Sequence, residues 1–361
     1  MKKLLSIGLA AMLAFGLATT SFAATDDAAA EPTVTIKKTY QVVNAGTTAP
    51  AETFTFTVVP GDVTDAATGV TADNMPMIGT KGTDADEKTI YTAEVSFGDI
   101  TTDTTIPFTV ALPECDKTAA VGADGRYAAY PSVGVYTYYL TEVDNGTAGV
   151  TYDVNKPTTA GVDQRIKVVV TVEQDTTGLI RVVGVHAERP YKTGDKKTDE
   201  IVNMYQAGEL DVSKTVEGNM GNKDKYFKFT VTLNAPVNKE VKSAIGVGKT
   251  SYPSNPTSIT VGTATDFYLK NGETLSFTNV PYGVTYTVTE ANEDYTTTVN
   301  GTAGVEVTGT IEHETTTAAY VNTKTGEVDT GVVLNNMPYI LVLAVLAAGV
   351  AVYIIRKRRE D

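Results

Sequence analysis

The sequence of 361 residues is poor in the residue types that usually form catalytic sites, metal sites and disulfide bonds. It contains one cysteine, two histidines and no tryptophan. A lone Cys115 cannot form an internal disulfide, so an exported chain of this kind needs another stabilising device. His186 and His313 lack metal-ligand or triad spacing, and no glycine-rich loop joins a strand to a helix. The sequence therefore predicts no enzyme, no metal site and no cofactor.

Long apolar runs occur at the two ends. Residues 1–23 carry two lysines, an apolar run and then small residues, which is the pattern of a secretory signal cleaved after Ala23. A membrane anchor is disfavoured there because the apolar core is short and the polar stretch TDDAAAE follows. Near the other end, residues 337–355 are long enough to cross a bilayer. The basic residues within 356–361 should stay cytoplasmic, so we expect the middle of the chain to lie outside the cell.

Acidic residues outnumber basic ones, at 43 Asp+Glu against 29 Lys+Arg and a net charge of −14. The two predicted terminal segments hold more basic than acidic residues, so the region between them is still more acidic. Such a surface repels phosphate backbones and anionic lipids. We therefore expect no nucleic acid partner.

The region between the ends is rich in Thr, Val and Tyr, with Gly, Asn and Asp at intervals and little helical periodicity. This composition predicts an all-β protein of short strands in β-sandwiches. Four motifs occur twice in the same order: VTIKKTY and LDVSKTV, TFTFTV and YFKFTV, YYLTE and YTVTE, IVN and YVN. They predict two homologous domains at 24–207 and 208–325, followed by a linker at 326–336. The first is longer, partly through a predicted hairpin at 166–185.

Each repeat places polar side chains on the apolar face of a strand. In YTVTE, Tyr286 and Val288 share a face with Glu290, because side chains alternate along a strand. The same alternation turns one lysine inward in each first strand and one asparagine inward in each last strand. The inward residues are Lys38, Glu142 and Asn203 in the first domain, and Lys214, Glu290 and Asn322 in the second.

A buried lysine, glutamate and asparagine can react with one another. Burial lowers the pKa of an amine and raises that of a carboxyl group, which leaves a neutral nucleophile and a proton donor. With a carboxamide held beside them, the amine can form an amide and release ammonia. A single lysine or glutamate on a strand is more often solvated or an edge residue, and a single asparagine a turn residue. The recurrence of all three types in both domains favours a self-made crosslink.

At these residues the sequence resembles Gram-positive, sortase-assembled pilus backbone subunits, whose domains are of the streptococcal pilin isopeptide-linkage kind. The resemblance rests on YYLTE and YTVTE, is closest over 276–290, and covers most of residues 33–325. It implies two tandem immunoglobulin-like sandwiches with Lys–Asn isopeptide bonds promoted by a glutamate. Carried over by position, the bonds are Lys38–Asn203 and Lys214–Asn322, with Glu142 and Glu290 as the catalytic acids.

The resemblance also implies a sortase, a transpeptidase that cuts an L-P-x-T-G motif between Thr and Gly. The matching stretch here is EVDTG, which puts the cut between Thr330 and Gly331. The Leu and Pro of the motif are missing, which suggests a divergent sortase. The new carboxyl end would join a lysine of the next subunit or peptidoglycan. Lys196 is the favoured acceptor, with Lys192 and Lys197 as alternatives, although a cluster of solvated charges is an equally good interpretation.

The function expected is therefore that of a structural shaft subunit in a pilus on the bacterial cell wall. The alternative is a wall-anchored adhesin or minor pilin. An adhesin would need a recognition domain, for which only the insert 61–88 leaves room, and there is no tryptophan for a sugar platform. The expected partners are identical subunits, a sortase and peptidoglycan, with a tip adhesin and a host surface as further possibilities.

Overall fold

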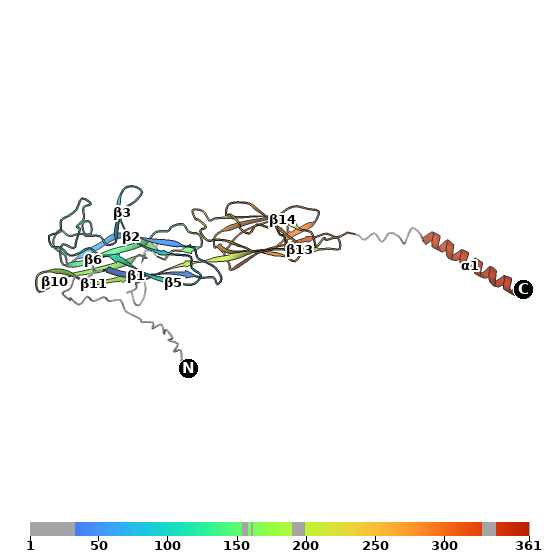
Figure 1. Ribbon diagram of the computed structural model, residues 1–361, viewed down its shortest axis with the longest axis horizontal. Coiled ribbons are helices and arrows are strands. Elements are labelled where there is room, and N and C mark those ends of the chain that lie inside the picture. Colours follow the sequence, from blue (N-terminus) through green and yellow to red (C-terminus); the bar gives the residue numbers. More distant parts are fainter. Residues whose placement is uncertain (1–32, 154–157, 160–161, 190–198, 327–336, 361) are drawn as a thin grey trace, which may run out of the picture.

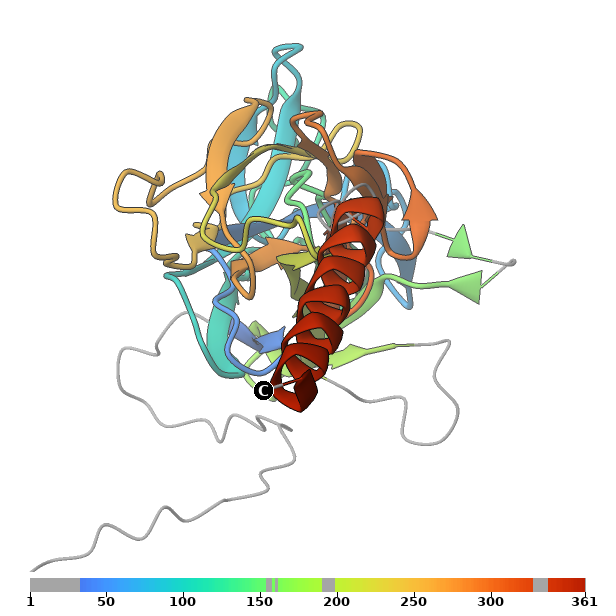
Figure 2. The ribbon, with the colours of Figure 1, turned by 90° about the vertical axis from the view of Figure 1, so that its right-hand side faces the viewer.

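The computed structural model describes residues 33–153, 158–159, 162–189, 199–326 and 337–360. These residues form mostly β-strands, gathered in two bodies that lie end to end, with one helix beyond the second body (Figure 1). Figure 2 views the same molecule along its length, so that the two bodies overlap behind the helix. The predicted all-β fold is confirmed.

The first body, here named the first sandwich, runs from β1 to β12. Within the described residues it contains a four-stranded sheet in the order β5-β1-β12-β7, a six-stranded sheet in the order β11-β10-β6-β2-β4-β3, and a small ribbon of β8 and β9. The strands are β1 (Thr33–Val42), β2 (Glu52–Thr64), β3 (Thr80–Thr83), β4 (Thr89–Phe97), β5 (Thr104–Ala111), β6 (Gly134–Glu142), β7 (Val150–Thr151), β8 (Thr158–Thr159), β9 (Val162–Asp163), β10 (Ile166–Gln174), β11 (Ile180–Glu188) and β12 (Glu200–Tyr205). The predicted hairpin at 166–185 forms the antiparallel pair β10 and β11.

Alternating side chains join the two sheets of the first sandwich. Along β2, Phe54 and Phe56 are buried whereas Thr53 is exposed. Phe56 stacks on Phe108 of β5 in the opposite sheet, with ring centroids 5.1 Å apart. Each such buried side chain contributes about 1.5–3 kcal/mol through removal of apolar surface from water.

The second body, here named the second sandwich, repeats this plan with its own core. Its described residues form a six-stranded sheet in the order β15-β17-β13-β22-β19-β20 and a four-stranded sheet in the order β16-β14-β18-β21. Phe267 and Phe277 meet edge to face between the sheets, with centroids 5.3 Å apart. The strands are β13 (Ala207–Glu217), β14 (Phe227–Asn234), β15 (Gly246–Val247), β16 (Thr265–Leu269), β17 (Thr274–Pro281), β18 (Thr285–Glu290), β19 (Thr296–Val299), β20 (Thr302–Ala303), β21 (Glu306–Thr310) and β22 (Thr315–Thr323).

The first and last strands of each sandwich are parallel neighbours. β1 pairs with β12, with Tyr40 opposite Asn203, and β13 pairs with β22, with Val216 opposite Asn322. The register is the same in both, since Tyr40 and Val216 each lie two residues after the inward lysine of their strand. One residue, Gln206, separates β12 from β13. The last strand of the first sandwich therefore leads almost directly into the first strand of the second.

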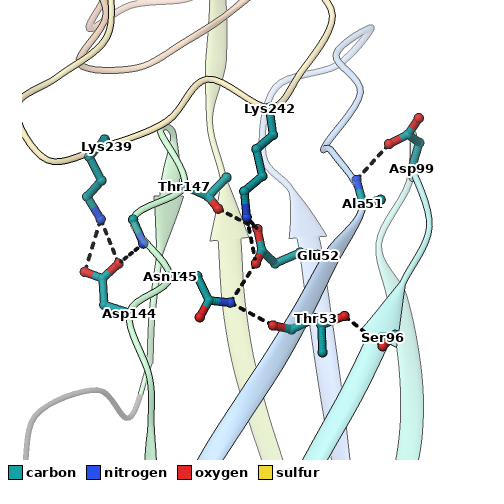
Figure 3. Close-up of polar contacts among 11 residues, drawn as sticks. Ala51, Glu52, Thr53, Ser96, Asp99, Asp144, Asn145, Thr147, Lys239 and Lys242 are labelled. Atoms are coloured by element: carbon teal, nitrogen blue, oxygen red, sulfur yellow. Dashed lines mark hydrogen bonds and ion pairs between the residues drawn. The ribbon is translucent and has the colours of Figure 1, made fainter. Parts of the chain in front are cut away.

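A buried carboxylate ties the two sandwiches together at their junction (Figure 3). Glu52, at the start of β2, accepts hydrogen bonds from Asn145 Nδ2 at 2.7 Å and Thr147 Oγ1 at 2.5 Å. Lys242 of the second sandwich reaches the same carboxylate, with its Nζ 3.0 Å from Oε2. Only 4% of Glu52 is exposed, so the carboxylate of this cross-domain ion pair is shielded from water, whereas the Lys242 side chain is partly exposed.

Backbone hydrogen bonds reinforce the junction beside this carboxylate. Glu240 of the second sandwich donates its N–H to the carbonyl of Gly146 at 2.7 Å, and its carbonyl accepts the N–H of Ala148 at 2.8 Å. Lys239 forms an ion pair with Asp144 at 2.9 Å. The connection between β14 and β15 therefore docks on the first sandwich through main-chain contacts and through the two charged contacts drawn in Figure 3.

Helix α1 (Met337–Glu360) contains the predicted membrane segment 337–355 and the start of the basic tail. Within the part of the chain that the structure describes, no helix has the length and apolar character needed to span a membrane. The membrane anchor stays a prediction, and the signal segment 1–23 lies outside the described residues.

Replacing Lys242 with alanine should loosen the junction, because the nearly buried Glu52 carboxylate would lose its cross-domain cation. We expect a loss of about 1–3 kcal/mol in the local opening free energy, the usual cost of leaving a buried polar group less well satisfied. Hydrogen exchange should accelerate at the amides of Ala148 and Glu240. Lys249→Ala, a change at an exposed lysine just after β15, is the control. Unchanged exchange at the junction in Lys242→Ala would show that the charge contact does not couple the sandwiches.

Candidate functional site

The first candidate site brings together the three residues predicted from the first repeat. Lys38 lies in β1, Glu142 ends β6, and Asn203 lies in β12, and all three side chains are buried. The Lys38 Nζ lies 2.9 Å from Glu142 Oε1. Asn203 Nδ2 donates to the same oxygen at 2.7 Å. The predicted inward orientation of these side chains is confirmed, and one carboxyl oxygen contacts both nitrogen groups.

The second candidate site has the same geometry. Lys214 lies in β13, Glu290 ends β18 and Asn322 lies in β22, each about 1% exposed. Lys214 Nζ donates to Glu290 Oε1 at 2.8 Å, and Asn322 Nδ2 donates to that same oxygen at 2.6 Å. The inward orientation predicted for these residues is also confirmed.

Strand pairing explains why each set of three residues converges. The lysine and asparagine come from the two parallel neighbours in one sheet, where the shared register puts them on the same inner face. The glutamate comes from a strand of the opposite sheet, β6 in the first sandwich and β18 in the second. Each site therefore spans the interior between two sheets, where bulk water does not reach the side chains.

Aromatic side chains form one wall of each site. The Lys38 Nζ lies 4.6 Å from the ring centroid of Phe54 and 5.8 Å from that of Phe56. In the second site, Lys214 Nζ lies 4.3 Å from Phe227 and 5.9 Å from Phe229. These rings come from the repeated motifs TFTFTV and YFKFTV. They exclude water, and their faces still stabilise the amine when it is protonated.

Burial moves the proton affinities in the first site toward the neutral forms. It lowers the pKa of Lys38 to about 8, even though the neighbouring Glu142 carboxylate acts in the opposite direction. Burial likewise raises the pKa of Glu142 above its ordinary value, against the effect of Lys38. Among the described residues, Glu142 Oε2 accepts no hydrogen bond. A carboxyl oxygen without a donor is less costly to bury when the group is protonated.

The second site shows shifts of the same sign. Burial lowers the pKa of Lys214 and raises that of Glu290, while the hydrogen bond between them opposes both shifts. Each site thus holds an amine with reduced proton affinity, a carboxyl group with increased proton affinity, and a carboxamide. This is the set of groups needed for an amine to displace ammonia from an amide.

Two residues that the repeat analysis did not find support the first site. The Asp153 N–H donates to Asn203 Oδ1 at 3.0 Å. Arg189, only 1% exposed, donates to both carboxylate oxygens of Asp153 at 2.7 Å each. The sequence could have identified Arg189, because it continues the buried, alternating positions of Val185 and Ala187. A charged residue on the apolar face of a strand is the same pattern that identified the two glutamates.

The remaining predicted functional residues are not placed by the structure. Lys192, Lys196 and Lys197 lie outside the described residues, as do Thr330 and Gly331. Their predicted roles in subunit linkage and sortase cleavage stay predictions.

The single cysteine, Cys115, is half-buried and packs against the core of the first sandwich. Burial raises the pKa of the Cys115 thiol to about 11, so the reactive thiolate is scarce at neutral pH. In the described residues, no group of three or more His, Cys, Asp or Glu side chains could hold a metal ion. These observations leave the two buried Lys, Glu and Asn sets as the candidate sites.

Two family models match the chain. Residues 34–206 match the Spy0128-like isopeptide containing domain, and residues 208–324 match a domain of unknown function, DUF7601. Along nearly its whole length the chain is similar to a pilin of Streptococcus pyogenes serotype M1, with 29% identity over 375 residues, or 96% of this chain and 98% of that protein. A shorter similarity, 30% over 163 residues, links 42% of this chain to 21% of the pilus tip adhesin Cpa of Streptococcus pyogenes.

A solved structure supports the fold. The crystal structure of the major pilin from Streptococcus pyogenes aligns with a TM-score of 0.50 and 24% identity, over 82% of this chain and 100% of that one. At 24% identity, this match indicates that the strands of the two proteins are arranged in a similar way.

The lowered pKa of Lys38 can be measured directly when the amine is kept free. In Asn203→Ala the carboxamide is absent, so the Lys38 amine stays available for titration. Its Cε chemical shift should titrate with a midpoint at about pH 8, because burial disfavours the charged form. The Cε resonance of a lysine in a short unstructured peptide, which titrates at about 10.4, serves as the reference. A Lys38 midpoint that coincided with that of the reference peptide would contradict the desolvated environment.

Proposed function

Because this chain belongs to the streptococcal pilin family, we propose that it is a structural shaft subunit of a covalent pilus on the bacterial cell surface. The observation that carries this function is the whole-length similarity to a pilin combined with two buried Lys, Glu and Asn sets of one geometry. The adhesin alternative is not favoured, because the similarity to Cpa is confined to 21% of that protein.

We propose that each sandwich closes an isopeptide bond within itself. In the first, the neutral Lys38 Nζ attacks Cγ of Asn203 and forms the new C–N bond. Glu142 accepts the proton of the attacking amine and delivers one to Nδ2, whose bond to Cγ breaks as ammonia leaves. The shared contact of both nitrogens with Glu142 Oε1 supports this relay. The reaction occurs once per site, so the protein modifies itself and is not an enzyme with turnover.

The second sandwich uses Lys214, Glu290 and Asn322 in the same roles. Its support is the matching pair of contacts on Glu290 Oε1 and the same direction of pKa shifts. Preorganisation lets a slow reaction between an amine and an amide proceed, because holding the groups together removes the entropic cost of encounter.

The proposed bonds suit a fibre that carries tension. Since β1 and β12 are parallel neighbours, pulling on the two ends of the sandwich shears one strand past the other. A Lys38–Asn203 bond would carry that force directly between the strands, and a Lys214–Asn322 bond would do the same between β13 and β22. The remaining strands of each sandwich would then lie outside the path of the force.

We further propose how the chain is exported and assembled. It would be joined by a sortase to identical subunits and finally to peptidoglycan, with the cut between Thr330 and Gly331. The sandwiches would be immunoglobulin-like. The segments are a signal at 1–23, domains at 24–207 and 208–325, a sorting linker at 326–336, a membrane helix at 337–355 and a cytoplasmic tail at 356–361.

The intact mass of the purified chain should fall below the value calculated from its sequence. Each bond releases one ammonia, so the loss should be about 17 Da per site and about 34 Da in all. Peptide mapping should find Lys38 joined to Asn203 and Lys214 joined to Asn322. A chain of unchanged mass, with these peptides separate, would refute both bonds.

Glu290→Ala is the matched variant for this measurement, because it removes one proposed acid and leaves the other site intact. The mass loss should halve. The second sandwich should melt lower, by about 10–20 °C, since a crosslink across a loop of about 100 residues stabilises by roughly 4–5 kcal/mol. A variant that kept the full mass loss would exclude Glu290 as the proton relay.

Lys196→Ala tests the proposed linkage between subunits. Cell-surface multimers that resist sodium dodecyl sulfate should disappear, while single chains should still reach the wall, because only the acceptor amine is removed. Immunoblots of wall extracts separate the two states, and Lys223→Ala, at an exposed lysine of the second sandwich, is the control. Multimer ladders that persist in Lys196→Ala would transfer the role to Lys192 or Lys197.

A further inference from the structure

We propose that Asp153 and Arg189 position the Asn203 carboxamide for attack by Lys38. This inference rests on the crosslinking reaction proposed above. It applies to the first sandwich alone, because the described residues supply no equivalent pair at the second site. Asp153 would stabilise the reacting oxygen through its backbone N–H, and Arg189 would act through Asp153.

The two residues form a clamp that joins three segments. Arg189 follows β11, and its two terminal nitrogens each donate to a different carboxylate oxygen of Asp153 at 2.7 Å. This bidentate contact fixes the orientation of the Arg189 and Asp153 side chains as well as the distance between them. The Asp153 Oδ2 also accepts the N–H of Val202 at 3.1 Å, next to Asn203 in β12. The segment after β7 is therefore held against β12 at the residue that must react.

The clamp determines which way the carboxamide faces. A backbone N–H can only donate, so the contact from Asp153 N at 3.0 Å requires Asn203 to present its oxygen on that side. The Asn203 nitrogen must then face Glu142, where it donates to Oε1 at 2.7 Å. The leaving nitrogen thus lies beside the proton donor, and the carbonyl oxygen lies beside a hydrogen-bond donor.

This orientation is the one that the reaction requires. When the Lys38 amine adds to Cγ, the C=O bond opens and negative charge develops on Oδ1 of Asn203. The Asp153 N–H already points at that oxygen, so it stabilises the charge without reorganisation. The charge returns to the carbonyl when the bond to Nδ2 breaks and ammonia leaves. Removal of one such donor typically slows acyl transfer about 100-fold to 1,000-fold.

The second site lacks this support. Asn322 Nδ2 donates to Glu290 Oε1, but among the described residues its Oδ1 accepts no hydrogen bond. Nothing there specifies the orientation of the carboxamide in the same way. We therefore expect the rate of Lys38–Asn203 bond formation to depend on the clamp. The rate of Lys214–Asn322 bond formation should not depend on it.

The test follows both bonds in one molecule as the full chain is made. Cell-free synthesis with a short labelling pulse starts the reaction, and denaturant stops it at successive times. Tryptic peptides then report the Lys38–Asn203 and Lys214–Asn322 bonds separately. In Arg189→Ala the first bond should form about 100-fold more slowly while the second forms at the wild-type rate. Arg181→Ala, at a more exposed arginine of β11 that pairs with Asp175, should change neither rate.

A milder variant keeps the test decisive if Arg189→Ala does not fold. Arg189→Lys keeps the charge but cannot hold both oxygens in a fixed plane, so it should recover part of the rate and remain about 10-fold slow. The defect should persist from about pH 6 to about pH 9. The Lys38 amine faces Glu142, with Asp153 and Arg189 farther away, so a variant that acted through the amine's proton would lose its effect at one end of this range.

Three results would count against the inference, and they are distinguishable. Wild-type rates of the first bond in either Arg189 variant would overturn it, as would a defect that vanished at high pH. Equal slowing of both bonds would assign Arg189 a general role in folding rather than in positioning. Absence of both bonds in the wild-type chain would instead refute the crosslinking reaction itself.

Discussion

The contact on which the whole structure depends is a single buried carboxyl oxygen that touches an amine and a carboxamide. It occurs once in each sandwich, at Glu142 Oε1 and at Glu290 Oε1. Burying a lysine and a glutamate costs free energy unless the two groups compensate each other. Because burial also pushes both groups toward their neutral forms, the feature that costs stability is the one that makes the amine reactive. With the proposed reaction, a chain with one cysteine would gain a covalent crosslink in each sandwich without any disulfide bond.

The topology places these contacts one after the other along the chain. β12 and β13 are separated by Gln206 alone, so the path from Lys38 through Asn203 to Lys214 and Asn322 runs almost continuously along the molecule. The junction between the sandwiches is braced beside this path by the buried Glu52, which holds a cation from the neighbouring body. The first sandwich also carries the protruding β3 region (Figure 1).

The two sites share their reacting groups but differ in their surroundings. At the first, Asp153 and Arg189 orient the carboxamide, and at the second the described residues leave Asn322 Oδ1 without a donor. The first lysine also lies in the longer sandwich, whose additional strand β11 ends just before Arg189. The extra sequence of the first domain thus contributes a side chain to the site. The three groups recur in both sandwiches, whereas among the described residues the donor to the asparagine oxygen occurs at the first site alone.

The sequence alone determined the strand faces, since alternation along a strand is a local property that can be read residue by residue. It showed that Lys38, Glu142 and Asn203 point inward, and the repeat showed that their second-domain counterparts do too. The parallel pairing of first and last strands, the shared carboxyl oxygen and the partners of Glu52 and Arg189 came only from the tertiary structure. Both of these residues carry the same inward signal, but a charge on an inner face does not reveal which strand lies opposite. That is decided by how the two sheets pack, which depends on contacts between residues far apart in the chain.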